Sequence, residues 1–137
     1  MERVHFPLLA TPVPAGFPSP ADDYVEARID LHHHLGPNRE ATFLMRVEGR
    51  SMEGFGIHDG DLLVVDRSLD PVDGSVVIAV IDGAFAVKQL RRDAHGLRLC
   101  AAHHDYPDLI PQAGQSVVVW GVVRWSLHRV LPCPASL

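Results

Sequence analysis

The sequence predicts a mostly β protein with a curled or barrel-like sheet, a flexible N-terminal arm and one short N-terminal helix. Short apolar, β-branched runs recur from residue 41 onward, and turns containing Gly and Asp separate them. Prolines interrupt the first 18 residues. The chain has 137 residues, 47% of them hydrophobic, which is enough for one domain with a substantial core. Disorder of the whole chain is therefore not expected.

The N-terminal segment divides into an arm and a helix. Residues 1–18 carry four prolines and no helical or strand period, which predicts an extended, mobile arm. A helix is expected to follow, because Ser19 is a suitable N-cap, Pro20 suits the first helical position and Asp22 lies three residues after the cap. It would continue through residues 24–29 and end at the consecutive histidines 32–34. The predicted organisation is an arm, residues 1–18, and one folded domain, residues 19–137.

Strands are expected in the remainder of the chain at residues 42–47, 62–65, 75–81, 84–90, 97–101 and 116–127. Asp82-Gly83 is the strongest hairpin signal, since this dipeptide favours a two-residue turn between paired strands. If Ile81 faces Ala84 across that turn, Val77 lies opposite Lys88.

Lys88 is the only lysine in the chain, beside eleven arginines. Alternation places it on one strand face with Ala86 and Leu90, with Val77 rather than a carboxylate across the hairpin. An apolar surrounding without an anion favours the neutral amine, which can act as a general base. The alternative is a lysine on an edge strand whose amine reaches water.

Ser51 is the best candidate for a nucleophile that such a base would activate. It follows the expected strand 42–47 and begins a glycine-rich segment. A strand-to-turn junction can expose the hydroxyl, and the backbone around Gly49, Arg50 and Met52 can supply the N–H groups of an oxyanion hole. The Gly-x-Ser-Met pattern alone is weak, because most such serines are turn residues.

Composition and charge exclude several other classes. The net charge of −5 does not suggest a strongly basic DNA-binding surface. No apolar run is long enough to span a bilayer, and His5 and Pro7 interrupt the apolar start that a signal peptide would need. Two cysteines, Cys100 and Cys133, are too few for a disulfide scaffold, so a cytoplasmic location is expected.

The nine histidines raise the possibility of a metal site. His32, His33 and His34 are consecutive and would point in different directions on a helix, so they cannot all face one ion. The run His103-His104-Asp105 could supply ligands, or a catalytic triad with Ser51, but a solvated loop is favoured. We therefore expect no metal and no cofactor.

Four ordered blocks of the chain resemble UmuD proteins, which belong to the LexA-like serine peptidases. The blocks are residues 16–31, 49–52, 59–66 and 82–90, and the resemblance extends from about Phe6 to Val123. It implies a Ser/Lys dyad on a β-rich fold, with Ser51 as nucleophile and Lys88 as general base. The self-cleavage bond implied by the family falls on Ala15-Gly16, where alanine precedes the glycine as in LexA repressors.

The resemblance also implies a biological role. UmuD-like proteins cut their own arm when RecA filaments on single-stranded DNA stimulate them. The trimmed homodimer then works with a UmuC-type Y-family DNA polymerase in SOS translesion synthesis. A repressor of the LexA type is not expected, because the fifteen residues before Gly16 contain no helix-turn-helix pattern for sequence-specific DNA binding. A LexA-family regulatory or interaction module without significant peptidase activity remains the alternative.

Overall fold

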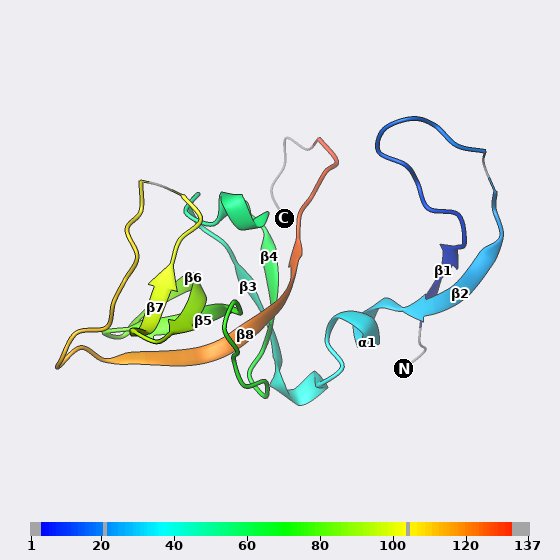
Figure 1. Ribbon diagram of the computed structural model, residues 1–137. Helices are drawn as coiled ribbons and strands as arrows, with labels where there is room; N and C mark the ends of the chain where they lie inside the picture. The colour runs from blue at the N-terminus through cyan, green and yellow to red at the C-terminus, as the bar shows by residue number, and fades with distance from the viewer. Residues whose placement is uncertain (1–3, 21, 104, 133–137) are drawn as a thin grey trace. The chain divides into compact units, whose positions relative to one another are not determined.

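The computed structural model describes residues 4–20, 22–103 and 105–132 (Figure 1). The chain forms two compact units, residues 1–37 and 38–137. Two residues considered above, His104 and Cys133, lie outside the described residues.

The first unit is built on an antiparallel strand pair. Strand β1 (His5–Leu9) pairs with β2 (Val25–Asp30), with His5 opposite Asp30 at one end and Leu9 opposite Val25 at the other. The backbone N–H of Ala10 donates to the Tyr24 carbonyl at 2.8 Å and prolongs the pairing. The intervening segment is therefore a wide loop closed at its base by backbone hydrogen bonds.

A short helix, α1 (Leu31–Leu35), follows β2 directly. Asp30 is its N-cap, and the Asp30 carboxylate accepts a hydrogen bond from the His33 backbone N–H at 3.2 Å. The chain does form one short N-terminal helix, as predicted, but the helix begins at Leu31, and its predicted start at Ser19 is wrong.

Residues 25–30 are a strand because their apolar and polar side chains alternate with period two. Val25, Ala27 and Ile29 alternate with charged residues, and β1 supplies the hydrogen-bonding partner. The prediction of an arm without any strand is also wrong for residues 5–9. Pro7 is tolerated there because β1 is an edge strand that leaves one side of its backbone unpaired.

The second unit is a six-stranded antiparallel sheet in the order β3-β4-β8-β5-β6-β7. Its strands confirm every strand expected after residue 41, with ends shifted by a few residues. They are β3 (Thr42–Arg46), β4 (Leu62–Asp66), β5 (Val76–Ile81), β6 (Ala84–Asp93), β7 (Gly96–Cys100) and β8 (Val117–Leu127). Short 3-10 turns, η1 (Arg39–Ala41) and η2 (Glu53–Phe55), precede β3 and β4. Strand β8, orange in Figure 1, joins the β3-β4 hairpin to the β5-β6-β7 group.

Two apolar clusters stabilise the sheet. One contains Val47, Met52, Ile57, Leu63, Val65 and Ile78, and the other contains Val77, Ala79, Leu90, Leu99 and Val122. Neighbouring residues of β5 divide between the clusters, as expected of a strand whose alternate side chains leave opposite faces. Gly121 lets β8 approach β4 closely, because a Cβ at that position would come within 2.6 Å of Val65 Cγ1.

A buried carboxylate, Asp66, ends β4 and has no exposed surface. It accepts hydrogen bonds from Asn38 Nδ2 at 2.8 Å, from Arg124 Nε at 3.0 Å, and from the backbone N–H and hydroxyl of Ser68 at 2.8 and 2.6 Å. Burial alone would raise the pKa of Asp66, but these hydrogen bonds outweigh it and hold the pKa far below its ordinary value. Asp66 therefore ties the ends of β4 and β8 to the segment that enters β3.

Candidate active site

Ser51 lies in a loop that connects β3 to β4. The loop is closed at its base by two backbone hydrogen bonds, from Val47 N to Asp61 O and from Gly60 N to Val47 O, both 2.8 Å long. Further into the loop, the N–H of Gly49 donates to Asp59 Oδ1 at 2.7 Å. Gly49 has a φ of +99°, a left-handed conformation that favours glycine. These bonds fix the path of the chain as it approaches Ser51.

The residues on either side of Ser51 anchor it differently. Met52 is 1% exposed and packs in the cluster with Val47 and Ile57. Arg50 is exposed, and its Nε donates to Glu53 Oε1 at 2.8 Å, which raises the pKa of the Arg50 guanidinium. Ser51 itself is half-buried between these two environments.

The Ser51 loop also contacts the segment that follows β7. The carbonyl of Ser51 accepts a hydrogen bond from the backbone N–H of Ala102 at 2.7 Å. A Cβ placed on Gly54 would come within 2.5 Å of the Ala102 carbonyl oxygen, so the two segments are in close contact. Sequence analysis did not identify Ala102, because its role is carried by the backbone and leaves no side-chain signal.

Backbone donors are available beside the candidate nucleophile. Within the described part of the chain, the N–H groups of Arg50, Ser51 and Met52 make no hydrogen bond. Unpaired N–H groups next to a serine are what an oxyanion hole requires.

Lys88 lies on β6 in the predicted register. Ile81 pairs with Ala84 and Val77 pairs with Lys88 across a turn in which Asp82 and Gly83 have φ values of 48° and 85°. Positive φ at both positions is the geometry of a tight two-residue hairpin. The predicted hairpin is therefore confirmed residue by residue.

The surroundings of Lys88 are apolar. Its cross-strand neighbour Val77 and its same-face neighbour Leu90 both have no exposed surface, and Lys88 itself is half-buried. Its amine makes no hydrogen bond or ion pair with any described residue.

Strand β7 pairs with β6, which carries Lys88, and the segment after β7 contacts the Ser51 loop. Gln89 of β6 pairs with Cys100, the last residue of β7, so Ala101 is next in line opposite Lys88. Ala102, which binds the Ser51 carbonyl, follows immediately. No hydrogen bond joins Ser51 Oγ to Lys88 Nζ among the described residues.

The predicted cleavage bond, Ala15-Gly16, lies in the first unit, whereas Ser51 and Lys88 lie in the second. Both of its residues are exposed, within the loop between β1 and β2. A Cβ added at Gly16 would meet no atom within 4 Å. The glycine side of the bond therefore has open space around it.

The remaining candidates from the sequence occupy other settings. Asp105 N donates to His103 Nδ1 at 3.1 Å, and the His103 ring lies 5.5 Å from that of Tyr106. The part of the chain that the structure describes holds no cluster of three side chains suited to a metal ion. No helix within the described ranges is long and apolar enough to cross a membrane.

Comparison with known proteins extends the argument to nearly the whole chain. Residues 7–124 match the family described as Peptidase S24-like. The chain is 42% identical to protein SamA of Salmonella typhimurium over 123 residues, which are 90% of this chain and 85% of SamA. It is 43% identical to protein MucA of Escherichia coli over 127 residues, 91% of this chain and 86% of MucA. It is 41% identical to a LexA repressor of Azoarcus over 109 residues, 80% of this chain and 53% of the repressor.

These matches confirm the resemblance drawn from the four sequence blocks. They also confirm the predicted functional class, a UmuD-like protein of SOS mutagenesis with a peptidase domain, and they do not favour the alternative of a module without peptidase activity. The chain belongs to the peptidase S24-like family, as a UmuD-like protein.

Proposed function

We propose that the protein is a serine endopeptidase that cuts its own Ala15-Gly16 bond with Ser51 and Lys88. The observation that carries this proposal is the contact of the Ser51 loop with Ala102, beside the strand pair that holds Lys88. A general base must present a neutral amine, and Val77 and Leu90 beside Lys88 are apolar and buried.

The steps follow from these groups. Lys88 Nζ takes the proton of Ser51 Oγ as the oxygen attacks the carbonyl carbon of Ala15. The N–H groups around Ser51 stabilise the oxyanion. The C–N bond then breaks, Lys88 returns the proton to the Gly16 nitrogen, and an acyl-enzyme remains on Ser51. Water, deprotonated by Lys88, hydrolyses that ester and frees Ser51.

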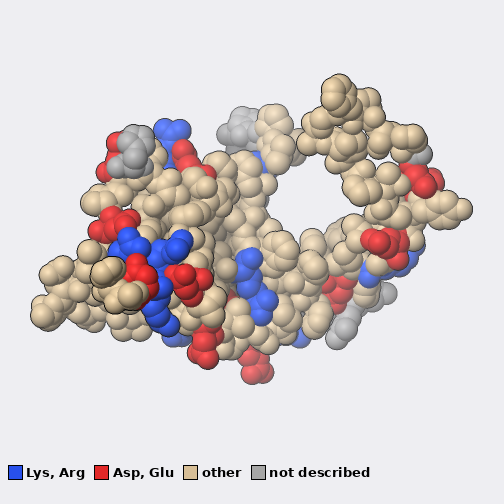
Figure 2. All heavy atoms as spheres, in the orientation of Figure 1, with Lys and Arg blue, Asp and Glu red and all other residues tan. Residues whose placement is uncertain are grey.

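The proposed biological setting comes from the family resemblance. RecA filaments on single-stranded DNA would stimulate the cut in the cytoplasm, and the trimmed form would act with a UmuC-type polymerase. Sequence-specific binding of this chain to DNA is not part of the proposal. On the face seen in Figure 2, blue and red side chains are interspersed and do not form the continuous basic surface that DNA binding favours.

The cleavage site is tested by mass. Purified full-length protein, incubated at alkaline pH and separately with RecA filaments, is expected to yield a product that begins at Gly16. Alkaline pH promotes the reaction because only a neutral amine can accept the serine proton. Intact-mass spectrometry identifies the new terminus. A different terminus, or an uncut chain under both conditions, would contradict the assignment of the bond.

Association is tested in solution. We propose a homodimer, in which twofold symmetry lets an arm reach either active site. Light scattering at micromolar concentration is expected to give twice the chain mass of 15.0 kDa. A species at the monomer mass would contradict this prediction.

A further inference from the structure

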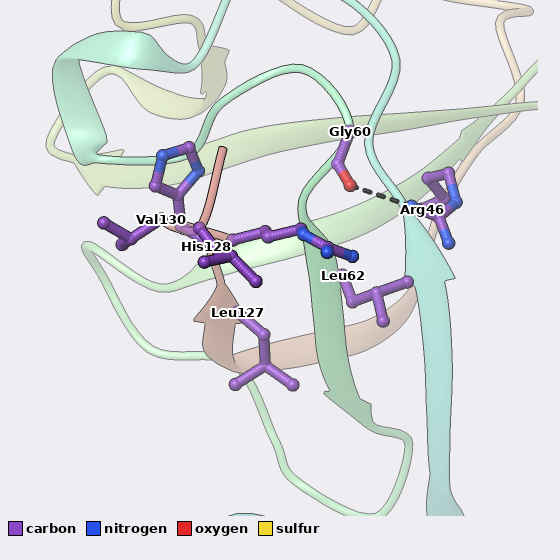
Figure 3. Close-up of a pocket in the computed structure, with 8 residues that line it drawn as sticks. Arg46, Gly60, Leu62, Leu127, His128 and Val130 are labelled. Atoms are coloured by element: carbon purple, nitrogen blue, oxygen red, sulfur yellow. Dashed lines mark hydrogen bonds between the residues drawn. The ribbon is translucent and has the colours of Figure 1, made fainter. Parts of the chain in front are cut away.

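An open pocket with a volume of about 420 Å³ lies where β3 ends, β4 begins and β8 runs out into the C-terminal segment. Eight residues line it, all drawn in Figure 3, where Arg46, Gly60, Leu62, Leu127, His128 and Val130 are labelled; the other two are Arg129 and Leu131. None of them takes part in the proposed peptidase chemistry.

One part of the pocket is cationic. Arg46 and Arg129 both line it, and its described lining residues include no carboxylate. Arg46 Nη1 donates to the Gly60 carbonyl at 2.9 Å, which fixes the side chain in place (Figure 3). A guanidinium has several N–H donors, so this bond leaves others for a ligand, and their planar arrangement suits a carboxylate.

Asp61, the buried carboxylate between the lining residues Gly60 and Leu62, already has hydrogen-bond partners. It is 2% exposed, and it bonds His128 Nδ1 at 2.7 Å, the His58 N–H at 2.8 Å and the Ser126 hydroxyl at 3.0 Å. Asp61 therefore takes its hydrogen bonds from His58, Ser126 and His128, and none of its bonds within the described residues is to Arg46 or Arg129.

Apart from the two arginines, Gly60 and His128, the lining residues are aliphatic, and the apolar surface extends along the sheet. Arg46, Leu62 and Leu127 form one cross-strand row. The next row on the same face includes Leu44 and Trp125, which are 62% and 42% exposed. Partly exposed aliphatic side chains such as Leu44 near two arginines suit a partner that is both acidic and aliphatic.

A protein segment fits this surface better than a nucleic acid does. A nucleic acid needs many phosphate contacts, whereas this pocket offers two arginines on a chain of net charge −5. Leucine and valine side chains contribute nothing to phosphate binding, but they pack well against aliphatic residues of a peptide.

The pocket also borders the base of the Ser51 loop. Gly60, which binds Arg46, donates to Val47, and the adjoining Asp61 carbonyl accepts from Val47. A ligand that engages Arg46 would therefore act on the residues that close this loop.

We infer that this pocket is a docking site for an acidic, leucine-containing segment of a partner protein. Carboxylates of the segment pair with Arg46 and Arg129, and its leucines pack on Leu62, Leu127 and the neighbouring row. The inference goes beyond the proposed peptidase function and holds whether or not the chain cuts itself.

The test is a titration of the full-length chain, followed by ¹H–¹⁵N NMR. The probe is an eight-residue peptide of alternating Glu and Leu. Amides at Arg46, Gly60, Leu127 and His128 are expected to shift, together with amides of the Ser51 loop. Peptides with Lys in place of Glu, or Ser in place of Leu, are expected to bind at least about tenfold more weakly.

Arg129→Glu is expected to raise the Kd of the Glu-Leu peptide about tenfold or more. Arg39→Glu is the matched control, because Arg39 is an exposed arginine outside the pocket and its replacement changes the net charge equally. Equal weakening by both variants would overturn the proposal, as would equal binding of the Lys-Leu peptide or of oligothymidylate. Shifts at the same amides when the protein alone is concentrated would assign the surface to a second copy instead.

Discussion

Full-length protein carrying Ser51→Ala is expected to stay uncut at alkaline pH and with RecA filaments. Without the hydroxyl no nucleophile remains, and the rate is expected to fall by a factor on the order of 10⁴ or more. Gel analysis over time, checked by intact mass, measures the remaining chain. Ser116→Ala is the matched control, because Ser116 is an exposed serine immediately before β8, and this variant should cut itself at the normal rate.

Lys88→Arg distinguishes a base from a mere cation. The substitution nearly keeps length and charge, but a guanidinium does not release its proton, so cleavage should be lost as completely as in Ser51→Ala. Lys88→Ala should be inactive as well. Both variants should retain the circular dichroism spectrum of the fold, because the hairpin turn at Asp82-Gly83 is unchanged.

The wild-type rate is expected to rise with pH, since the neutral fraction of the amine increases. Cleavage by Lys88→Arg at the wild-type rate would show that the lysine is not the base. In that event, His103 or His104 becomes the next candidate for the base.

Asp66→Asn is expected to lower the free energy of unfolding more than any other substitution that we propose. The substitution removes the charge that Arg124 and the hydrogen bonds from Asn38 and Ser68 compensate, and it puts an N–H₂ group where an acceptor is needed. Breaking a buried pair of this kind costs about 3–5 kcal/mol in free energy of unfolding. Urea denaturation measures the loss. Asp70→Asn is the control, because Asp70 is exposed and should change stability little.

Asp66 also predicts a pH dependence of stability. Its pKa is lower in the folded chain than in the unfolded chain. The stabilisation is therefore complete above the unfolded pKa, about 3.9, and is lost as pH falls toward the folded value. Wild-type protein should lose stability below about pH 4, and Asp66→Asn should lose less over the same range. Parallel losses in the two proteins would contradict the assignment.

The sheet of the second unit could be predicted from local sequence because its strands are apolar runs bounded by turn residues. Asp82-Gly83 even determined the register of Lys88. The first unit could not, because the residues after Ser19 satisfy the rules for a helix start while Val25, Ala27 and Ile29 also alternate as a strand. The partner strand β1 decided between the two, and local rules do not include a partner distant in sequence.

Only part of the candidate site could be predicted in the same way. Ser51 and Lys88 stand out because their chemistry is specific and the blocks around them are distinctive. Asp59 and Ala102 support the Ser51 loop through a carboxylate and a backbone N–H, and contacts of that kind emerge only once the chain has folded. The pocket beside Arg46 combines residues of three separate segments, so no sequence window contains it.

Because a loop joins β1 to β2, the proposed cut at Ala15-Gly16 would be irreversible. While the chain is intact, the loop keeps β1 at high effective concentration beside β2. After the cut, only an exposed two-strand pairing would retain the released fragment, and such pairs are marginally stable in water. At cellular dilution the fragment departs, and the unpaired edge of β2 becomes available for a new contact. Self-cleavage would thus expose a backbone edge of β2 that stays exposed after the activating signal has ended.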